Sequence, residues 1–165
     1  MSEGFTAWRL AVESRQIAAD DLSGQGSARS GGRWNSPGEP VVYAASSISL
    51  ACLETIVHLG GDDPLPLVRW LLELRIPPLH WEARTVFHAA EHPGWDARPW
   101  GPVSEGWGTA WLHSRSSLLA EVPSVIVPEE ANVLINPVHP AISALSLRKV
   151  RRWRYDTRLL PGGSR

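Results

Sequence analysis

Residues 31–58 read GGRWNSPGEPVVYAASSISLACLETIVH and place a glycine-rich loop, a short strand and a helix in immediate succession. The strand is predicted over residues 40–44, which are rich in β-branched side chains and end in an aromatic one. The helix is predicted over residues 46–60, because a serine can cap its start and a pair of glycines can stop it. Strand and helix follow each other so closely that both can present side chains to one cleft.

The loop surrounds Arg33 and Trp34 with three glycines and a proline, which is more than a plain connecting turn needs. Glycines allow the backbone to approach a ligand closely, and exposed amides beside a guanidinium form an anion site. An arginine can also fork onto two phosphate oxygens. The pattern matches neither a P-loop nor a dinucleotide fingerprint, because no strand leads straight into it and no helix leaves it. The alternative is an ordinary surface loop with Arg33 solvated and Trp34 in the core.

The helix carries Glu54 and His58 four residues apart, so they share one edge together with Ala51 and Thr55. A solvated face is the usual explanation for such a glutamate. The opposite arc is broad and apolar, which predicts that little of this helix faces water. The residues of that arc are Ile48, Cys52, Leu53, Ile56, Val57 and Leu59. Glu54 is therefore expected to share a cleft with Tyr43, the last aromatic of the preceding strand.

The rest of the chain predicts more strands than helices and shows no regular βαβ alternation. Strands are predicted over residues 5–10, 66–76 and 150–156, short apolar runs lie at 117–122, 124–127 and 132–135, and a short helix is predicted over 104–115. Residues 79–103 are rich in His, Pro and Trp and are expected to be irregular. We therefore expect a single α+β domain over residues 1–165, built on a mixed or antiparallel sheet with long functional loops.

Composition narrows the functional classes. The 165 residues are 43% hydrophobic and 20% charged, which is typical of a folded globular domain. The net charge of −1 gives the whole molecule no attraction to nucleic acid or to an anionic membrane. Cys52 is the only cysteine, which excludes an intramolecular disulfide and fits a reducing compartment. The N-terminal residues lack the features of a signal peptide, so a cytoplasmic location is expected.

Three further features have plain structural alternatives. Ser124 lies between a proline and an apolar run, which predicts a strand start with its hydroxyl in a pocket or simply at a strand edge. It lacks the GxSxG context of a hydrolase nucleophile. His88 and His92 are four residues apart, but no HExxH pattern accompanies them, so no metal site is predicted. The basic run 148–158 is a weak nucleic-acid signal, and a solvated edge strand with buried aromatics explains it at least as well.

Taken together, these segments resemble the RES domain, the toxin half of bacterial RES–Xre toxin–antitoxin pairs. The resemblance rests on residues 31–58, on VPSVIVPEEANVLINPVHP at 122–140 and on the closing WRYDTRLL. The arginine, glutamate and serine that give the family its name fall on Arg33, Glu54 and Ser124. The resemblance implies an ADP-ribosyltransferase-like fold and consumption of NAD by hydrolysis or phosphorolysis of the nicotinamide–ribose bond. It also implies an antitoxin partner with a DNA-binding domain that masks the active site.

The chemistry agrees with that implication. Cleavage of the nicotinamide–ribose bond releases neutral nicotinamide from a pyridinium, so the leaving group needs no proton and a second carboxylate is unnecessary. Glu54 can accept a ribose hydroxyl and stabilise the oxocarbenium-like transition state. We expect Arg33 to hold the phosphates and Tyr43 to stack on the nicotinamide ring. Ser124 is expected to bind the ribose or the carboxamide.

The expected site has two overlapping sets of residues and no metal. The catalytic set is Arg33, Tyr43, Glu54 and Ser124, and the NAD-binding set is Gly32, Arg33, Trp34, Asn35, Tyr43 and Asn136. NAD is expected as a substrate, and no true cofactor is expected. The expected partner is a cognate Xre-type antitoxin. A homodimer is compatible with the sequence. Direct binding of nucleic acid or of a membrane is not expected.

Two other activities remain compatible with the same residues. One is a protein ADP-ribosyltransferase, and the other is a module that binds NAD or ADP-ribose without turnover. A toxin directed at nucleic acid is disfavoured by the net charge. The residues alone do not distinguish water from phosphate as the acceptor.

Overall fold

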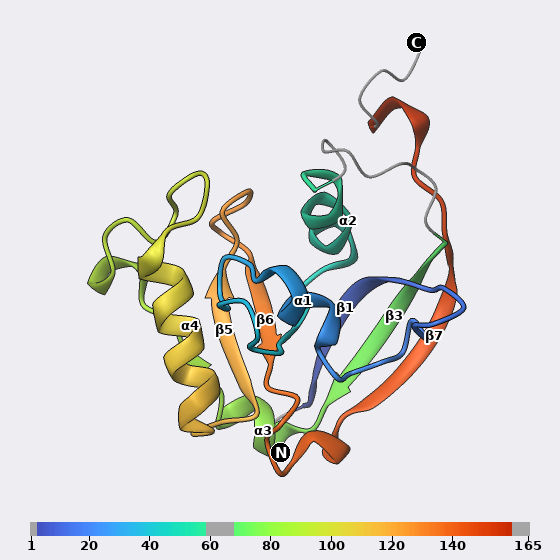
Figure 1. The fold of residues 1–165 in the computed structure, drawn as a ribbon. Helices are drawn as coiled ribbons and strands as arrows, with labels where there is room; N and C mark the ends of the chain where they lie inside the picture. Colours follow the sequence, from blue (N-terminus) through green and yellow to red (C-terminus); the bar gives the residue numbers. More distant parts are fainter. Residues whose placement is uncertain (1–2, 59–67, 160–165) are drawn as a thin grey trace.

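The computed structural model describes residues 3–58 and 68–159, which form one seven-stranded sheet covered by helices (Figure 1). The strand order is β4-β5-β6-β2-β1-β3-β7, and all neighbours are antiparallel except the parallel pair β4–β5. The strands are β1 (Phe5–Val12), β2 (Val42–Ala45), β3 (Arg69–Ile76), β4 (Thr85–Val86), β5 (Leu119–Pro123), β6 (Ala131–Ile135) and β7 (Ser146–Trp153). The α-helices are α1 (Gln25–Ser30), α2 (Ile48–Ile56), α3 (Pro78–Glu82) and α4 (Pro102–Ser114). Three 3-10 turns cover Ala89–Glu91, Ile142–Ala144 and Thr157–Leu159.

The two halves of the sheet meet at a narrow junction. β1 pairs with β3 along its whole length, but its register with β2 is the single pair Trp8↔Ala45. Figure 1 shows β5 and β6 beside α4, while β3 and β7 lie paired on the other side of the sheet. Helix α2 packs against both β1 and β2, with Leu50 and Ala51 buried against Leu10 and Ala45. A side chain one turn further along α2 therefore lies over this junction.

An aromatic core beneath α4 holds the glycine-rich loop in place. Trp34 is 2% exposed and contacts Phe87, Trp95 and Trp107 at ring-centroid distances of 4.8, 6.1 and 5.7 Å. Its backbone also lies directly on Gly108 of α4, where an added Cβ would be 1.9 Å from the Trp34 carbonyl oxygen. Trp34 thus lies in the core, as expected if the segment is an ordinary surface loop, which was one of the two alternatives for it.

The α+β prediction with a mixed sheet is confirmed. The helix predicted over residues 46–60 is α2, and Ser47 caps it by accepting the Leu50 backbone N–H at 3.1 Å. The glycine stop predicted at 60–61 lies outside the described residues, as does the start of the strand predicted from residue 66.

Three predictions about local structure were wrong. Residues 79–103 were expected to be irregular, but they contain most of α3, the strand β4 that pairs with β5, and a 3-10 turn. Residues 124–127 form a turn rather than a strand, because the Ser124 hydroxyl accepts the N–H groups of Ile126 and Val127 at 3.1 and 3.2 Å. The buried side of α2 is also not the predicted arc: Leu50 and Ala51 are buried, whereas Val57 is 58% exposed. The helix is apolar on almost every side, so periodicity did not identify the face that the sheet covers.

Candidate active site

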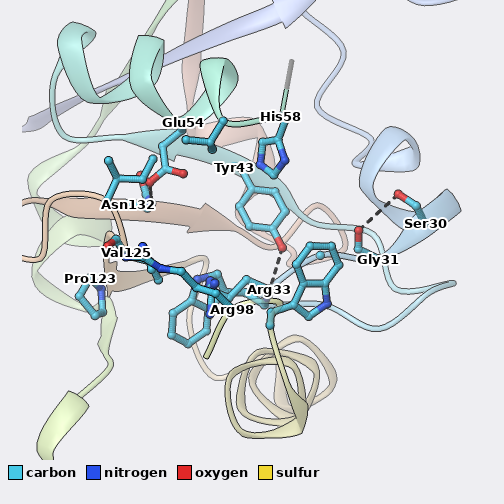
Figure 2. A pocket seen from close by; sticks show the side chains of 15 residues that line it. Ser30, Gly31, Arg33, Tyr43, Glu54, His58, Arg98, Pro123, Val125 and Asn132 are labelled. Carbon is cyan, nitrogen blue, oxygen red and sulfur yellow. Dashed lines mark hydrogen bonds between the residues drawn. The ribbon is translucent and has the colours of Figure 1, made fainter. Parts of the chain in front are cut away.

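A cavity of about 590 Å³ opens between the glycine-rich loop, α2 and the β5–β6 turn (Figure 2). The side chains that carry chemistry in its lining are Arg33, Tyr43, Glu54, His58, Arg98 and Asn132. A second cavity of about 260 Å³ shares four of these residues, Tyr43, Glu54, His58 and Asn132, and adds Arg9 and Arg69. Glu54 and the Tyr43 ring thus lie where the two cavities adjoin, and the shared cleft predicted for them is present.

Glu54 is held by two donors on one of its oxygens. Its Oε1 accepts the Ser124 hydroxyl at 2.8 Å and the Asn132 amide at 2.7 Å. Within the described residues no hydrogen bond occupies its Oε2. The carboxylate is therefore fixed in orientation by one oxygen while the other is left for a ligand.

Ser124 contacts Glu54 from the protein interior, on the side away from the cavity. Its side chain is fully buried and does not line the cavity. The hydroxyl donates to Glu54 and at the same time accepts the two N–H groups of the β5–β6 turn. This geometry makes Ser124 a positioning residue, in contrast to the direct contact with ribose or carboxamide that we expected.

Asn132 was not predicted from the sequence. It lies at the start of β6, where it is registered with Ala45 of β2 and Val122 of β5. A polar amide at the head of an otherwise apolar strand, NVLI, was the available signal.

Tyr43 joins the cavity to the glycine-rich loop. Its hydroxyl donates to Asn35 Oδ1 at 2.6 Å and accepts the Trp34 backbone N–H at 3.2 Å. Burial raises the pKa of the Tyr43 phenol, so the side chain is neutral. The hydroxyl is thus committed to the loop, and the ring is the part of Tyr43 that is free to contact a ligand.

The glycines of the loop serve its own packing. A Cβ on Gly32 would lie 2.9 Å from the Tyr43 hydroxyl oxygen. Gly31 has a φ of +71°, and a Cβ there would lie 2.9 Å from the Asn35 carbonyl oxygen. Close approach of a ligand to the backbone, the reason we gave for these glycines, is therefore not needed to explain them.

Asn35 and Asn136 are both fully buried and line neither of these cavities. The Asn35 amide donates to the carbonyls of Ser27 and Glu39 at 3.1 and 2.8 Å, so it shapes the loop. The Asn136 amide donates to the Leu112 carbonyl at 2.9 Å, beside a separate small cavity near α4. The structure thus does not bring these two predicted NAD-binding residues to the candidate site.

Arg33 crosses the floor of the cavity. Its Nη1 donates to the carbonyls of Trp95 and Ala97 at 2.8 and 3.0 Å. Burial, and then the positive charge of Arg98, lower the pKa of the Arg33 guanidinium. Within the described residues neither arginine forms an ion pair with a carboxylate, so both guanidinium groups keep donors for an anion.

Arg9 of β1 is a second cationic residue that sequence reasoning missed. Its Nη1 donates to the Tyr43 carbonyl at 2.6 Å, and its Nε is buried without a hydrogen-bond partner. Burial, and then the charge of Arg69, lower its pKa to about 10. The available signal was a charge between Ala7 and Ala11, both of which are buried in the same strand.

The described residues contain no group of three or more His, Cys, Asp or Glu side chains placed to hold a metal. Among them there is also no helix with the length and apolar character needed to cross a membrane.

The match to known proteins covers almost the whole chain. The profile of the RES domain matches residues 6–158. The chain belongs to the RES domain family. Its RES relatives include the Prs ADP-ribosylating toxin of Sphingobium sp. (strain YBL2), which is 50% identical over 93% of this chain and 95% of the relative. Toxin Res of Pseudomonas putida (strain KT2440) is 38% identical over 92% and 97% of the two chains.

A solved structure shares the fold. The Mycobacterium tuberculosis MbcT–MbcA toxin–antitoxin complex contains a chain with a TM-score of 0.64, over 91% of this RES chain and 84% of that chain. The sequence identity is 20%, so this likeness concerns the fold. The predicted membership in the RES toxin family is confirmed by the profile and by the relatives.

Proposed function

We propose that this RES protein is a toxin that uses NAD as its substrate and breaks the nicotinamide–ribose bond. The observation that carries the proposal is Glu54, the one carboxylate among the described residues that line the main cavity. Ser124 and Asn132 fix one of its oxygens, and the Tyr43 ring and Arg33 lie in the same cavity. One fixed carboxylate suffices for this reaction, because the departing nicotinamide is neutral and needs no acid.

In this reaction the bond between ribose C1′ and the pyridinium nitrogen breaks, and its electron pair leaves with nicotinamide. Glu54 Oε2 accepts a ribose hydroxyl and stabilises the positive charge that develops on the ribose. The Tyr43 ring offers a face for the nicotinamide, and Arg33 offers donors for the phosphates. The acceptor then forms a bond to C1′ and loses its proton.

We propose a protein side chain as the acceptor. The support is the relative that is 50% identical over nearly the whole chain and is named as an ADP-ribosylating toxin of Prs. A second candidate is transfer to inorganic phosphate or water, which depletes NAD. The second cavity favours phosphate, because Arg9 and Arg69 line it directly beside Glu54.

The test is a product analysis with the purified protein. NAD is supplied alone, with inorganic phosphate, or with the host Prs protein, and nicotinamide, ADP-ribose, ADP-ribose phosphate and modified protein are followed. Protein acceptance predicts modified Prs in step with nicotinamide release. Release of ADP-ribose phosphate or ADP-ribose in its place would favour the second candidate. Absence of nicotinamide under all three conditions would reject NAD cleavage.

We also propose that an Xre-type antitoxin restrains the toxin by filling the main cavity. The support is the shared fold of a chain that was solved as a toxin–antitoxin complex. An acidic or carboxylate-ended segment of the partner suits the cationic floor formed by Arg33 and Arg98. The complex should then fail to bind NAD, and a stable complex that cleaves NAD at the rate of the free protein would reject occlusion.

A further inference from the structure

Residues 92–101, which connect the Ala89–Glu91 turn to α4, contribute Arg98 and Trp100 to the main cavity. This segment is tied down from two directions. Arg33 donates to its carbonyls at Trp95 and Ala97, and Arg98 Nη2 donates to the Val125 carbonyl of the β5–β6 turn at 3.0 Å. Trp95 itself is buried in the aromatic core. The segment therefore presents Arg98 and Trp100 from a fixed position.

Figure 2 shows Arg98 and Arg33 side by side, across the cavity from Glu54 of α2 and from His58, which follows the end of that helix. The two charges are close enough that Arg98 lowers the pKa of Arg33, while Glu54 and Asp96 act more weakly in the opposite sense. Neither guanidinium has an ion-pair partner in residues 3–58 and 68–159. Two adjacent guanidinium groups that have free donors and, among the described residues, no carboxylate in an ion pair with either of them fit a ligand with two linked anionic groups.

Trp100 adds a flat apolar surface to this cationic site. It is 41% exposed, whereas Trp34, Trp95 and Trp111 are buried in the core beneath α4. An exposed indole in a cavity wall can stack on any nucleobase, because each base presents a π-face. A nucleoside diphosphate such as ADP has both features, because its diphosphate can lie between the two arginines while its base stacks on the indole.

We propose that Arg98 and Trp100, together with Arg33, form the subsite for the ADP half of NAD. The proposal rests on the proposed use of NAD and deepens it. The arginine pair holds the diphosphate, Trp100 stacks on the adenine, and the nicotinamide ribose then reaches Glu54. The ADP half is bound before and during the reaction, so Arg98 and Trp100 contribute to substrate affinity and to the preference for NAD over nicotinamide riboside, which has the same scissile bond without the ADP half.

The experiment compares Trp100→Ala, Trp100→Phe and Arg98→Ala with the unaltered full chain. The affinity for ADP and ADP-ribose is measured by calorimetry, and kcat and KM are measured for NAD and for nicotinamide riboside. Trp100→Ala and Arg98→Ala should weaken ADP binding and raise the KM for NAD by about tenfold, with kcat nearly unchanged. Trp100→Phe should restore most of the affinity, and kcat/KM for nicotinamide riboside should not change in any of the three variants. Val138→Ala, at an exposed residue outside the cavity lining, is the control.

Unchanged ADP affinity in both alanine variants would overturn the inference. A loss of protein modification at unchanged KM for NAD would also overturn it, because Trp100 would then contact the acceptor. An equal loss of kcat/KM with nicotinamide riboside, which has no ADP half, would overturn it as well. ADP binding requires no turnover, so it tests this subsite even in a protein that does not cleave NAD. Failure of the subsite and failure of the proposed reaction are therefore distinguishable.

Discussion

At the scale of single residues, the candidate site depends on hydrogen bonds that hold its reactive groups from behind. Ser124 is buried and links Glu54 to two backbone N–H groups of the β5–β6 turn. The Tyr43 hydroxyl links the cavity to the loop that carries Arg33. The Ser124 hydroxyl and the Tyr43 hydroxyl therefore influence a ligand through the neighbours that they position, while the Tyr43 ring lines the cavity itself.

Ser124→Ala should lower kcat with little change in the KM for NAD. The change removes one of two donors to the Glu54 carboxylate, and a hydrogen bond to a charged group is worth about 1.5–3 kcal/mol, or roughly tenfold to a hundredfold in rate. Steady-state kinetics of nicotinamide release check this split. A rise in KM at constant kcat would instead mean that Ser124 contacts the substrate.

Tyr43→Phe should destabilise the protein and raise the KM for NAD. Without the hydroxyl, Asn35 Oδ1 and the Trp34 N–H lose their shared partner, and a buried unpaired polar group costs about 1–3 kcal/mol. Urea unfolding and the KM for NAD check both effects. Wild-type stability and KM would show that the hydroxyl does not hold the loop.

The sequence predicted five residues of the cavity, because they lie within 31–58, where local succession places them near one another. They are Gly32, Arg33, Trp34, Tyr43 and Glu54. Asn132 and Arg9 escaped prediction because they reach the site through the pairing of distant strands. Asn136 was misplaced for the same reason, since its surroundings near α4 depend on the tertiary fold.

At the scale of elements, α4 is the support against which the Arg33 loop is built. The Trp34 backbone rests on Gly108, which is buried, whereas Gly106 in the same helix is exposed with no atom within 4 Å of an added Cβ. Both glycines lower helix propensity equally, so the amino-acid sequence alone does not distinguish them. Their different roles follow from which side of α4 faces the loop.

The pair Gly108→Ala and Gly106→Ala tests this support. Gly106→Ala should stabilise the protein by roughly 0.5–1 kcal/mol through helix propensity. Gly108→Ala places a Cβ 1.9 Å from the Trp34 carbonyl oxygen, so it should destabilise by about 1–3 kcal/mol and raise the KM for NAD. The free energy of unfolding of the two variants is the measurement. Equal stabilisation by both would show that the loop does not rest on α4.

At the scale of the whole molecule, ion pairs fasten the edge strand β7 to the sheet. Glu73 of β3 pairs with Arg148 of β7 and with Arg75, and these hydrogen bonds, that of Arg148 first, lower the pKa of the Glu73 carboxyl. Glu73 lies among apolar residues of β3 and is only 7% exposed, which is unusual for a carboxylate. The basic run 148–158 partly explains this burial, because Arg148 pairs with the Glu73 carboxylate and covers it.

Glu73→Gln should reduce the dependence of stability on acid. A carboxyl whose folded pKa lies below its usual 4.5 stabilises the protein above pH 4.5 and loses that contribution as the pH falls through the folded pKa. The variant should therefore melt below the wild type at about pH 6, and the gap should narrow below pH 4.5. Glu129→Gln, at an exposed carboxylate, serves as the control. A gap that does not change with pH would contradict the role of this pair.

The central claim is that Glu54 drives cleavage of the nicotinamide–ribose bond, and Glu54→Gln tests it most directly. Gln keeps an oxygen that can accept from Ser124 and Asn132, so the fold and the affinity for ADP-ribose should be preserved while the negative charge is lost. The measurement is the single-turnover rate of nicotinamide release from NAD. The Glu54→Gln variant should bind ADP-ribose like the wild type and release nicotinamide roughly 10² to 10³ times more slowly. A release rate near that of the wild type would contradict the claim.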